Sequence, residues 1–261
     1  RGAMISVGTL FPFDGGQQVP LNPYNRGATV VATLLWPAAL YVRRFGAWIS
    51  VGLIGSGLVI LSTYASQAAI LALAVGIIAA VSVLAHRIFA AALGVVVAIV
   101  ILAMPLLPPM LPPPAELRTE MHLPGSHYHR LLIWKFTAER IAERPILGWG
   151  LESSKVIPGN KSRPDGQEPA LPLHPHNAAL QVWLELGVVG ALIAAALAVF
   201  LGRAIRRLPT PSAAAAVGCF ASATVISFVS YGIWQSWWLA AMFIAGAFSV
   251  LAIRSERLDA G

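Results

Sequence analysis

The chain is a series of long apolar stretches separated by short polar segments and one long polar segment. Each stretch is close to the roughly 20 residues that a helix needs to cross a hydrocarbon core about 30 Å thick. The stretches are rich in Ala, Leu, Val and Ile and lack the two-residue alternation of an outer-membrane barrel. They predict an all-α integral membrane protein with about seven transmembrane helices. The predicted spans are residues 27–43, 47–63, 66–85, 88–107, 178–202, 211–231 and 235–253, of which the first two are short.

Short basic clusters follow the first, third, fifth and seventh stretches and predict the orientation of the chain. If all seven stretches cross the membrane, the four clusters lie on one face. The excess of Lys and Arg in cytoplasmic loops makes this the cytoplasmic face. The clusters are Arg43-Arg44, Arg87, Arg203/Arg206/Arg207 and Arg254/Arg257.

This orientation divides the chain into three parts. Residues 1–107 hold an outer N-terminal segment and four spans. Residues 108–176 form one large outer loop, and residues 177–261 hold three spans and a short cytoplasmic tail.

The composition supports a membrane protein and excludes several other classes. Hydrophobic residues make up 57% of the chain and charged residues only 11%, with a mean hydropathy of +0.72, whereas a soluble domain is about one quarter charged. The net charge of +7 comes from the basic clusters that follow the predicted spans, so we expect no nucleic-acid partner. Cys219 is the only cysteine, which excludes an intrachain disulfide. The opening residues 1–4 do not form a signal segment, and the sequence reads as one entered partway along.

The long outer loop has its own organisation. It begins in the proline-rich residues 105–114, which end the fourth span. Residues 129–144 predict an amphipathic helix, closed by Pro145. This helix either lies on the membrane surface with Trp134 at headgroup depth or forms one wall of a substrate cavity, and the two roles are compatible. Residues 151–173 predict a mobile loop above the site. The predicted apolar stripe of the helix is Leu131, Trp134, Ala138 and Ile141.

The loop ends in His174-Pro175-His176-Asn177, directly before the fifth span. Asn177 is a good helix N-cap. If the helix begins there, Asn177, Gln181 and Glu185 share one face because they recur every four residues. Glu185 is the only acidic residue inside a predicted span. Such a residue indicates a functional site, or it serves as a hydrogen-bond partner between helices.

His176 is the candidate general base. An imidazole with a pKa near its ordinary value of about 6.5 accepts a proton at neutral pH. The alternative is an interfacial histidine without a chemical role. The loop holds several more histidines, but their spacing lacks the His-Glu-x-x-His pattern, so we predict no metal site. The loop histidines are His122, His127, His129, His174 and His176.

Two arginines lie at comparable depth on the outer face. Arg26 opens the first span and Arg130 opens the amphipathic helix. Each is either an interfacial anchor or a phosphate ligand, because a guanidinium offers a planar fork of donors to phosphate oxygens. Together with a histidine, the pair would suit a lipid-linked pyrophosphate.

These residues resemble the bacterial O-antigen ligase family. His176-Asn177, nine residues, Gly187, two residues and Gly190 are similar to the family signature His-Asn-x9-Gly-x-x-Gly, within the block HPHNAALQVWLELGVVGA. Tyr24-Asn25-Arg26 resembles the outer arginine that precedes a membrane helix in the family. Residues 130–134 and 144–150 resemble the run that leads into the large periplasmic loop. Four helices, a large loop and three helices also resemble the C-terminal part of the family.

The resemblance implies a function and a site. Such ligases transfer a polysaccharide from undecaprenyl pyrophosphate to a lipid A–core acceptor during lipopolysaccharide biosynthesis. They act at the periplasmic face of the bacterial inner membrane, resemble membrane glycosyltransferases of the C type, and need no metal or other cofactor. By resemblance, His176 activates the acceptor hydroxyl, while Arg26 and Arg130 bind the pyrophosphate and stabilise the leaving group with inversion at the anomeric carbon.

Further substrate contacts are expected from the residues beside this triad. Asn177, Gln181 and Glu185 follow the histidine on its helix, and Trp234 belongs to the run Trp234-Gln-Ser-Trp-Trp238 before the last span. The tryptophans form either an aromatic belt at the membrane surface or a platform for sugar or lipid. One departure stands out, because family members usually carry about twelve spans and this sequence shows seven.

Other functions remain open at this point. O-antigen polymerases and protein O-oligosaccharyltransferases share the donor and the fold and differ in the acceptor. A transporter or assembly protein is the non-enzymatic alternative. A transporter needs ionisable groups near the middle of the membrane, where this chain has only Glu185. If the chain is a ligase, Arg26, Arg130 and His176 should converge on one outward-facing cavity.

Overall fold

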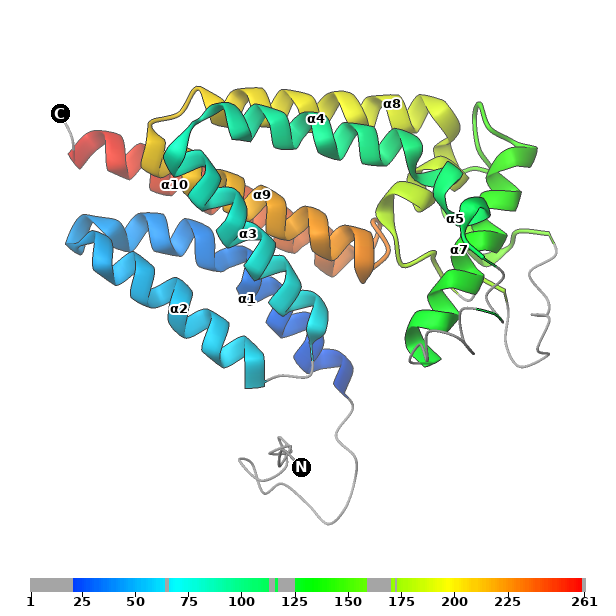
Figure 1. Cartoon of the computed structure of the whole chain (residues 1–261), viewed down its shortest axis with the longest axis horizontal. Helices are drawn as coiled ribbons and strands as arrows, with labels where there is room; N and C mark the ends of the chain where they lie inside the picture. The colour runs from blue at the N-terminus through cyan, green and yellow to red at the C-terminus, as the bar shows by residue number, and fades with distance from the viewer. Residues whose placement is uncertain are drawn as a thin grey trace, which may run out of the picture.

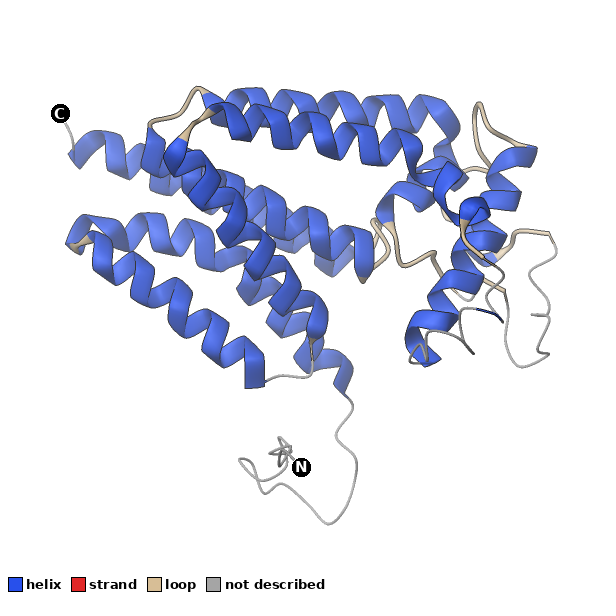
Figure 2. Ribbon diagram, viewed as in Figure 1, coloured by secondary structure: helices blue, strands red, loops and turns tan. Residues whose placement is uncertain are grey.

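The computed structural model describes residues 21–63, 66–112, 116, 125–158, 170–171 and 173–259. Within these ranges every regular element is a helix (Figure 2). The long helices are α1 Leu21–Val42, α2 Ala47–Thr63, α3 Gln67–Ala85, α4 Ile88–Ala103, α7 Gly125–Glu143, α8 Ala178–Arg206, α9 Thr210–Val229 and α10 Ser236–Asp259. Short helical turns are η2 Arg43–Phe45, η3 Met104–Leu106, α5 Leu107–Met110 and η4 Ser153–Lys155.

Each of the seven predicted stretches forms a helix. Five of these helices are long and apolar enough to cross a membrane, which confirms an all-helical integral membrane architecture. α2 is apolar but has only 17 residues, and α1 is not among the five. A count of seven spans therefore stays a prediction. The five candidate spans are α3, the run Ile88–Met110, α8, α9 and α10 as far as Glu256.

The helices pack in pairs that bring distant parts of the chain together. α4 lies along α8, α3 lies along α9, and α1 contacts α2, α9 and α10 (Figure 1). The α1–α2, α3–α4 and α8–α9 turns and the last turns of α10 lie at one end, on the left of Figure 1. We call this the arginine end, because the basic clusters of the short turns lie there. α5, α7 and the α9–α10 connection lie at the opposite end, which we call the loop end.

Small residues allow the helix pairs to approach closely. A Cβ atom added to Gly94 of α4 would lie 2.6 Å from the carbonyl oxygen of Ala198 in α8, and one added to Gly202 would meet α4 in the same way. A Cβ atom added to Gly76 of α3 would similarly lie 3.0 Å from the carbonyl oxygen of Gly218 in α9. Because lipid chains are as apolar as the helices, close van der Waals packing of this kind holds membrane helices together.

The amphipathic helix of the long loop is present as α7, which packs on α8 and α5. Its predicted apolar stripe is only partly correct. Ala138 and Ile141 are buried, but Leu131 and Trp134 are half-buried. Ile133 and Thr137 are completely buried instead. Thr137 tolerates burial because its hydroxyl donates to the carbonyl oxygen of Ile133, 2.7 Å away. Most of the predicted mobile loop 151–173 lies outside the described residues.

Candidate active site

The predicted cap of the fifth span is confirmed. Asn177 is the N-cap of α8, and its side-chain oxygen accepts a hydrogen bond of 3.0 Å from the backbone N–H of Leu180. The residue before it, His176, has a φ of 54°, a left-handed conformation that is uncommon outside glycine. The backbone N–H of His176 donates to Nδ1 of His174 at 3.2 Å. The turn therefore presents the His176 side chain in one fixed direction at the loop end.

The imidazole of His176 is held from the opposite side by the α9–α10 connection. Its Nδ1 lies 2.6 Å from the carbonyl oxygen of Ser230. A carbonyl oxygen only accepts hydrogen bonds, so Nδ1 carries the proton in the neutral ring and Nε2 keeps its lone pair. Trp134 of α7 supports the same turn, because its indole N–H donates to the carbonyl oxygen of Pro175 at 2.9 Å.

The surroundings keep both histidines of the turn neutral. The pKa of His176 is lowered from 6.5, mainly by burial and further by the positive charge of Arg130, although its hydrogen bond to Ser230 opposes this shift. Burial and the neighbouring His176 lower the pKa of His174 to about 4. At neutral pH, His176 is therefore an uncharged imidazole with an unprotonated Nε2, the form that accepts a proton.

Tyr231 interacts electrostatically with both arginines that the sequence singles out. Burial raises its pKa, while a hydrogen bond with Thr29 and the positive charges of Arg26 and Arg130 lower it. Thr29 in turn donates from its hydroxyl to the carbonyl oxygen of Arg26 at 2.8 Å. Arg130 also acts on His176 electrostatically. Arg26, Arg130 and His176, which come from α1, α7 and the start of α8, are thus brought together around the α9–α10 connection.

Aromatic rings complete this cluster. Tyr231 packs edge-on against Trp237 with ring centroids 4.7 Å apart. The guanidinium carbon of Arg26 lies 5.4 Å from the centre of the Trp237 ring, within the range of a cation–π contact. The positive charge at Arg26 is therefore held at the loop end by an aromatic surface, without a carboxylate partner among the described ion pairs.

Comparison with known proteins assigns the family. The family model described as O-antigen ligase matches residues 50–195, which is more than half of the 261 residues. The chain belongs to the O-antigen ligase family. The matched range includes Arg130 and the whole of the signature from His176 to Gly190. Arg26 lies before it.

Curated relatives agree with this family. Proteins provisionally named polysaccharide ligases from *Rickettsia conorii* and *Rickettsia felis* are 42% and 41% identical to the chain over 119 residues. One from *Rickettsia prowazekii* is 40% identical over 125 residues. Each match covers 44% of this chain and 29% of the relative, so the chain spans less than a third of the relatives' length. No solved structure gives a significant match.

The first glycine of the family signature breaks α8. Gly187 has φ 61° and ψ −158°, a combination that is essentially confined to glycine. The backbone of the preceding loop occupies the break. The N–H of Trp149 donates to the carbonyl oxygen of Leu184 at 2.8 Å, and the N–H of Val188 donates to that of Pro145 at 2.8 Å. The hydrogen bonds that the helix loses at Gly187 are thus replaced by bonds to residues 145–150.

Glu185 lies just before this break and is completely buried. Its two oxygens accept four hydrogen bonds, from the backbone N–H of Glu152 (2.9 Å), the hydroxyl of Ser154 (2.9 Å), the amide of Gln181 (3.0 Å) and the indole of Trp234 (2.6 Å). These donors come from the long loop, α8 and the α9–α10 connection. Glu185 therefore connects three segments of the site, which agrees with the structural alternative considered for it.

The other predicted substrate contacts are also occupied by internal hydrogen bonds. Gln181 accepts from the backbone N–H of Ile233 at 2.9 Å, and Trp234 uses its indole N–H on Glu185. Asn177 caps α8. These contacts position the α9–α10 connection against the first turns of α8. Contact with substrate stays a prediction for Asn177, Gln181, Glu185 and Trp234.

Sequence reasoning missed the residues of the α9–α10 connection that link the triad. Ser230 contributes a backbone carbonyl, which no side-chain pattern reveals. Tyr231 is the last residue of the predicted span 211–231, and a phenol at the outer end of a span is a signal that could have been used. Trp237 belongs to that run, but only the fold shows that it lies under Arg26.

No metal centre is found within the described part of the chain. No three His, Cys, Asp or Glu side chains gather there in a way that could hold an ion. His174 and His176 lie with ring centroids 4.3 Å apart, but their described partners are backbone groups and the side-chain amide of Gln235. His122 and the side chain of His127 lie outside the described residues.

Proposed function

We propose that the chain forms the catalytic part of an O-antigen ligase. The enzyme transfers a polysaccharide from undecaprenyl pyrophosphate to a lipid A–core acceptor in lipopolysaccharide biosynthesis. The observation that carries the proposal is the convergence of His176, Arg130 and Arg26 around Ser230 and Tyr231. Family membership supplies the reaction class, a polysaccharide ligase acting on lipid-linked glycans.

The geometry supports a base-assisted displacement. Nε2 of His176 takes the proton of the acceptor hydroxyl, and the hydroxyl oxygen forms a bond to the anomeric carbon of the glycan. The bond between that carbon and the pyrophosphate oxygen breaks, and undecaprenyl pyrophosphate leaves with the electron pair. Attack opposite to the leaving group inverts the configuration at the anomeric carbon.

The two arginines hold the pyrophosphate and stabilise the charge that develops on it. Guanidinium forks match phosphate oxygens in pairs, and fixed positive charges in a partly buried site lower the energy of the transition state. Arg130 is half-buried, and burial lowers the pKa of its guanidinium. Because guanidinium groups supply the positive charge, the mechanism requires no metal ion, and chelators should leave the rate unchanged.

The same proposal assigns the topology. α1 and α2 are the two further spans, which gives seven in total, and the arginine end faces the cytoplasm of a bacterial inner membrane. The loop end, with the long loop 108–176, then faces the periplasm. There it meets the lipid-linked donor and the lipid A–core acceptor at the membrane surface.

Reconstitution tests the proposal and separates it from its alternatives. The purified chain in proteoliposomes receives undecaprenyl-pyrophosphate glycan together with lipid A–core, a second glycan donor or an acceptor peptide. Glycan appearing on lipid A–core supports the ligase. Growth of the glycan on its own carrier would assign an O-antigen polymerase, and glycosylated peptide would assign a protein O-oligosaccharyltransferase.

A His176→Ala variant is the matched control for every acceptor. If the unmodified chain and this variant transfer glycan at the same rate, the proposed mechanism is overturned. Movement of a solute across the vesicle membrane without any glycan transfer would instead support the non-enzymatic transporter.

A further inference from the structure

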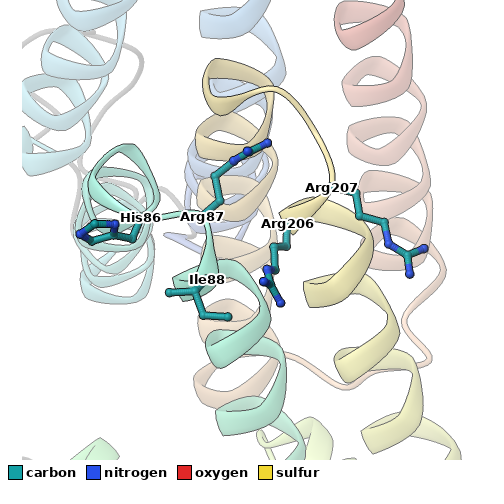
Figure 3. Close-up of a pocket in the computed structure, with 5 residues that line it drawn as sticks. All are labelled: His86, Arg87, Ile88, Arg206 and Arg207. Atoms are coloured by element: carbon teal, nitrogen blue, oxygen red, sulfur yellow. The ribbon is translucent and has the colours of Figure 1, made fainter.

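A second polar site lies at the arginine end, far from the candidate active site. A cavity of about 470 Å³ opens between the α3–α4 turn and the end of α8 (Figure 3). Its lining combines one apolar side chain with histidine and arginine and contains no acidic residue. The lining residues are His86, Arg87, Ile88, Arg206 and Arg207.

The walls of this cavity are tied together. Nη1 of Arg87 donates to the carbonyl oxygen of Leu208 at 3.1 Å, which connects the α3–α4 turn to the α8–α9 turn. One to two helical turns inside the bundle, Gly94 and Gly202 allow the backbones of α4 and α8 to approach closely. This packing leaves little freedom for the two helices to separate, so the backbones that carry the lining side chains keep their spacing.

The guanidinium groups of the cavity carry charge that the described residues leave unpaired. No described carboxylate forms an ion pair with Arg87, Arg206 or Arg207. The neighbouring arginines of the same end differ in this respect. Arg43 pairs with Glu256 at 3.0 Å, and Arg44 stacks on the Tyr41 ring at 4.0 Å. The cavity therefore gathers three arginines without a described carboxylate partner, whereas Arg43 is paired and Arg44 is covered by a ring.

The surroundings of the cavity indicate the kind of anion. Leu84, Ile88 and Phe89 are 58%, 49% and 46% exposed and flank the basic group on the side of the helix bundle. In a multi-pass membrane protein, such side chains contact lipid acyl chains. A soluble phosphate would contact only the guanidinium groups. A phospholipid would contact the guanidinium groups with its headgroup and the apolar side chains with its acyl chains.

We propose that this cavity binds the phosphate headgroup of an anionic membrane phospholipid. In Figure 3, Arg206 lies between the ribbons of α4 and α8, Arg87 is directed toward the chain that follows α8, and Arg207 points to the far side of α8. The guanidinium groups of Arg87 and Arg206 point in different directions, so both turn toward the phosphate when it binds, and Arg207 contributes its charge from a greater distance. The acyl chains lie along Leu84, Ile88 and Phe89.

Native mass spectrometry of the purified chain tests the site, with phosphatidylglycerol as the probe and phosphatidylcholine as the uncharged comparison. One phosphatidylglycerol should stay bound under conditions that remove phosphatidylcholine. Arg206→Gln should weaken its binding about fivefold, and the double variant R87Q/R206Q about thirtyfold, because each arginine near the surface contributes on the order of one kilocalorie per mole. Arg207→Gln should have the smaller effect.

Arg203→Gln is the matched control, because Arg203 is an exposed arginine on the same helix that does not line the cavity. The single variant R206Q leaves the Arg87–Leu208 hydrogen bond in place, so its effect does not depend on loss of the fold. Equal loss of lipid in R203Q and R206Q would overturn the site, since general surface charge would then explain the binding. Displacement of the lipid by millimolar inorganic phosphate would overturn the assignment to a phospholipid.

Discussion

Nδ1 of His176 lies 2.6 Å from the carbonyl oxygen of Ser230, a residue 54 positions later in the chain. This single contact fixes both the direction of the imidazole and its tautomer. It also joins the start of α8 to the connection that contains Tyr231, on which the charges of Arg26 and Arg130 both act. The proposed base and the proposed pyrophosphate ligands therefore depend on one segment of backbone for their relative positions.

Loss of the His176 imidazole should abolish most of the glycan transfer. His176→Gln keeps a polar side chain at the turn but offers no base, so we expect the transfer rate to fall by about 10²–10⁴-fold. The measurement is the rate of glycan transfer in proteoliposomes, with membrane insertion followed by protease protection. A rate within a factor of two or three of the unmodified chain would exclude His176 as the base.

The pH profile of the reaction should report the neutral form of His176. Its pKa lies below 6.5 because of burial and the charge of Arg130, so the unprotonated base persists below pH 6.5. The rate should be level above this pH and fall as the pH is lowered through the depressed pKa. The quantity to measure is kcat/KM. A midpoint above 6.5 would mean that another group controls the reaction. Arg130→Gln should move the midpoint upward, because it removes a positive charge.

Replacement of the forked guanidinium at Arg26 should be more harmful than its retained charge suggests. Arg26→Lys keeps the positive charge but loses the paired donors and the stack on Trp237. We expect transfer to fall on the order of tenfold or more, with KM for the donor rising. The control is Arg44→Lys, which changes an arginine stacked on Tyr41 at the opposite end. Equal turnover in both variants would argue against a paired contact with pyrophosphate.

Glu185 should matter more for stability than for chemistry. Glu185→Ala leaves two buried and two partly buried donors without their acceptor, and we expect a loss of roughly 3–5 kcal/mol in the free energy of unfolding. Ser154→Ala removes only one of these hydrogen bonds and should cost about 1 kcal/mol. Thermal unfolding in detergent compares the two. A stable Glu185→Ala variant that has lost transfer would instead assign Glu185 a direct part in the reaction.

The break in α8 should require glycine. A Cβ atom at Gly187 would collide with the carbonyl oxygen of Ile146, and the backbone conformation itself disfavours any other residue. Gly187→Ala should therefore destabilise the fold by at least about 3 kcal/mol. Gly52→Ala in α2 is the control, because its Cβ would meet no atom within 4 Å and alanine favours a helix. The comparison needs only the two unfolding temperatures, and equal values would contradict the assigned role of the break.

Features that depend on neighbouring residues in the sequence were predicted well. The five candidate spans follow from runs of apolar residues, and their ends differ from the predicted ones by a few residues. The cap at Asn177 and the shared face of Gln181 and Glu185 follow from helix geometry. The family signature pointed to His176 because its pattern is continuous in the chain.

Features that depend on contacts between distant segments were not predictable in the same way. The burial of Ile133 and Thr137 on α7 is set by α8 and α5, so the helix period alone gives the wrong stripe. Gly187 looks like any glycine in an apolar helix until residues 145–150 pair with the broken turn. Tyr231 becomes part of the candidate site only because α1 and α7 bring their arginines close enough to act on it electrostatically.

The interruption at Gly187 also separates two mechanical roles within α8. The first part of α8, as far as Val189, is bonded to the long loop and the α9–α10 connection, while the later residues Ala198 and Gly202 pack closely on Gly94 of α4. A membrane span tilts when the thickness of the surrounding bilayer changes. In this chain, we expect the part of α8 beyond Val189 to follow such a tilt while the bonds of the first part keep His176 in register with Ser230. We therefore expect the geometry of the candidate active site to depend little on the lipid composition of the membrane.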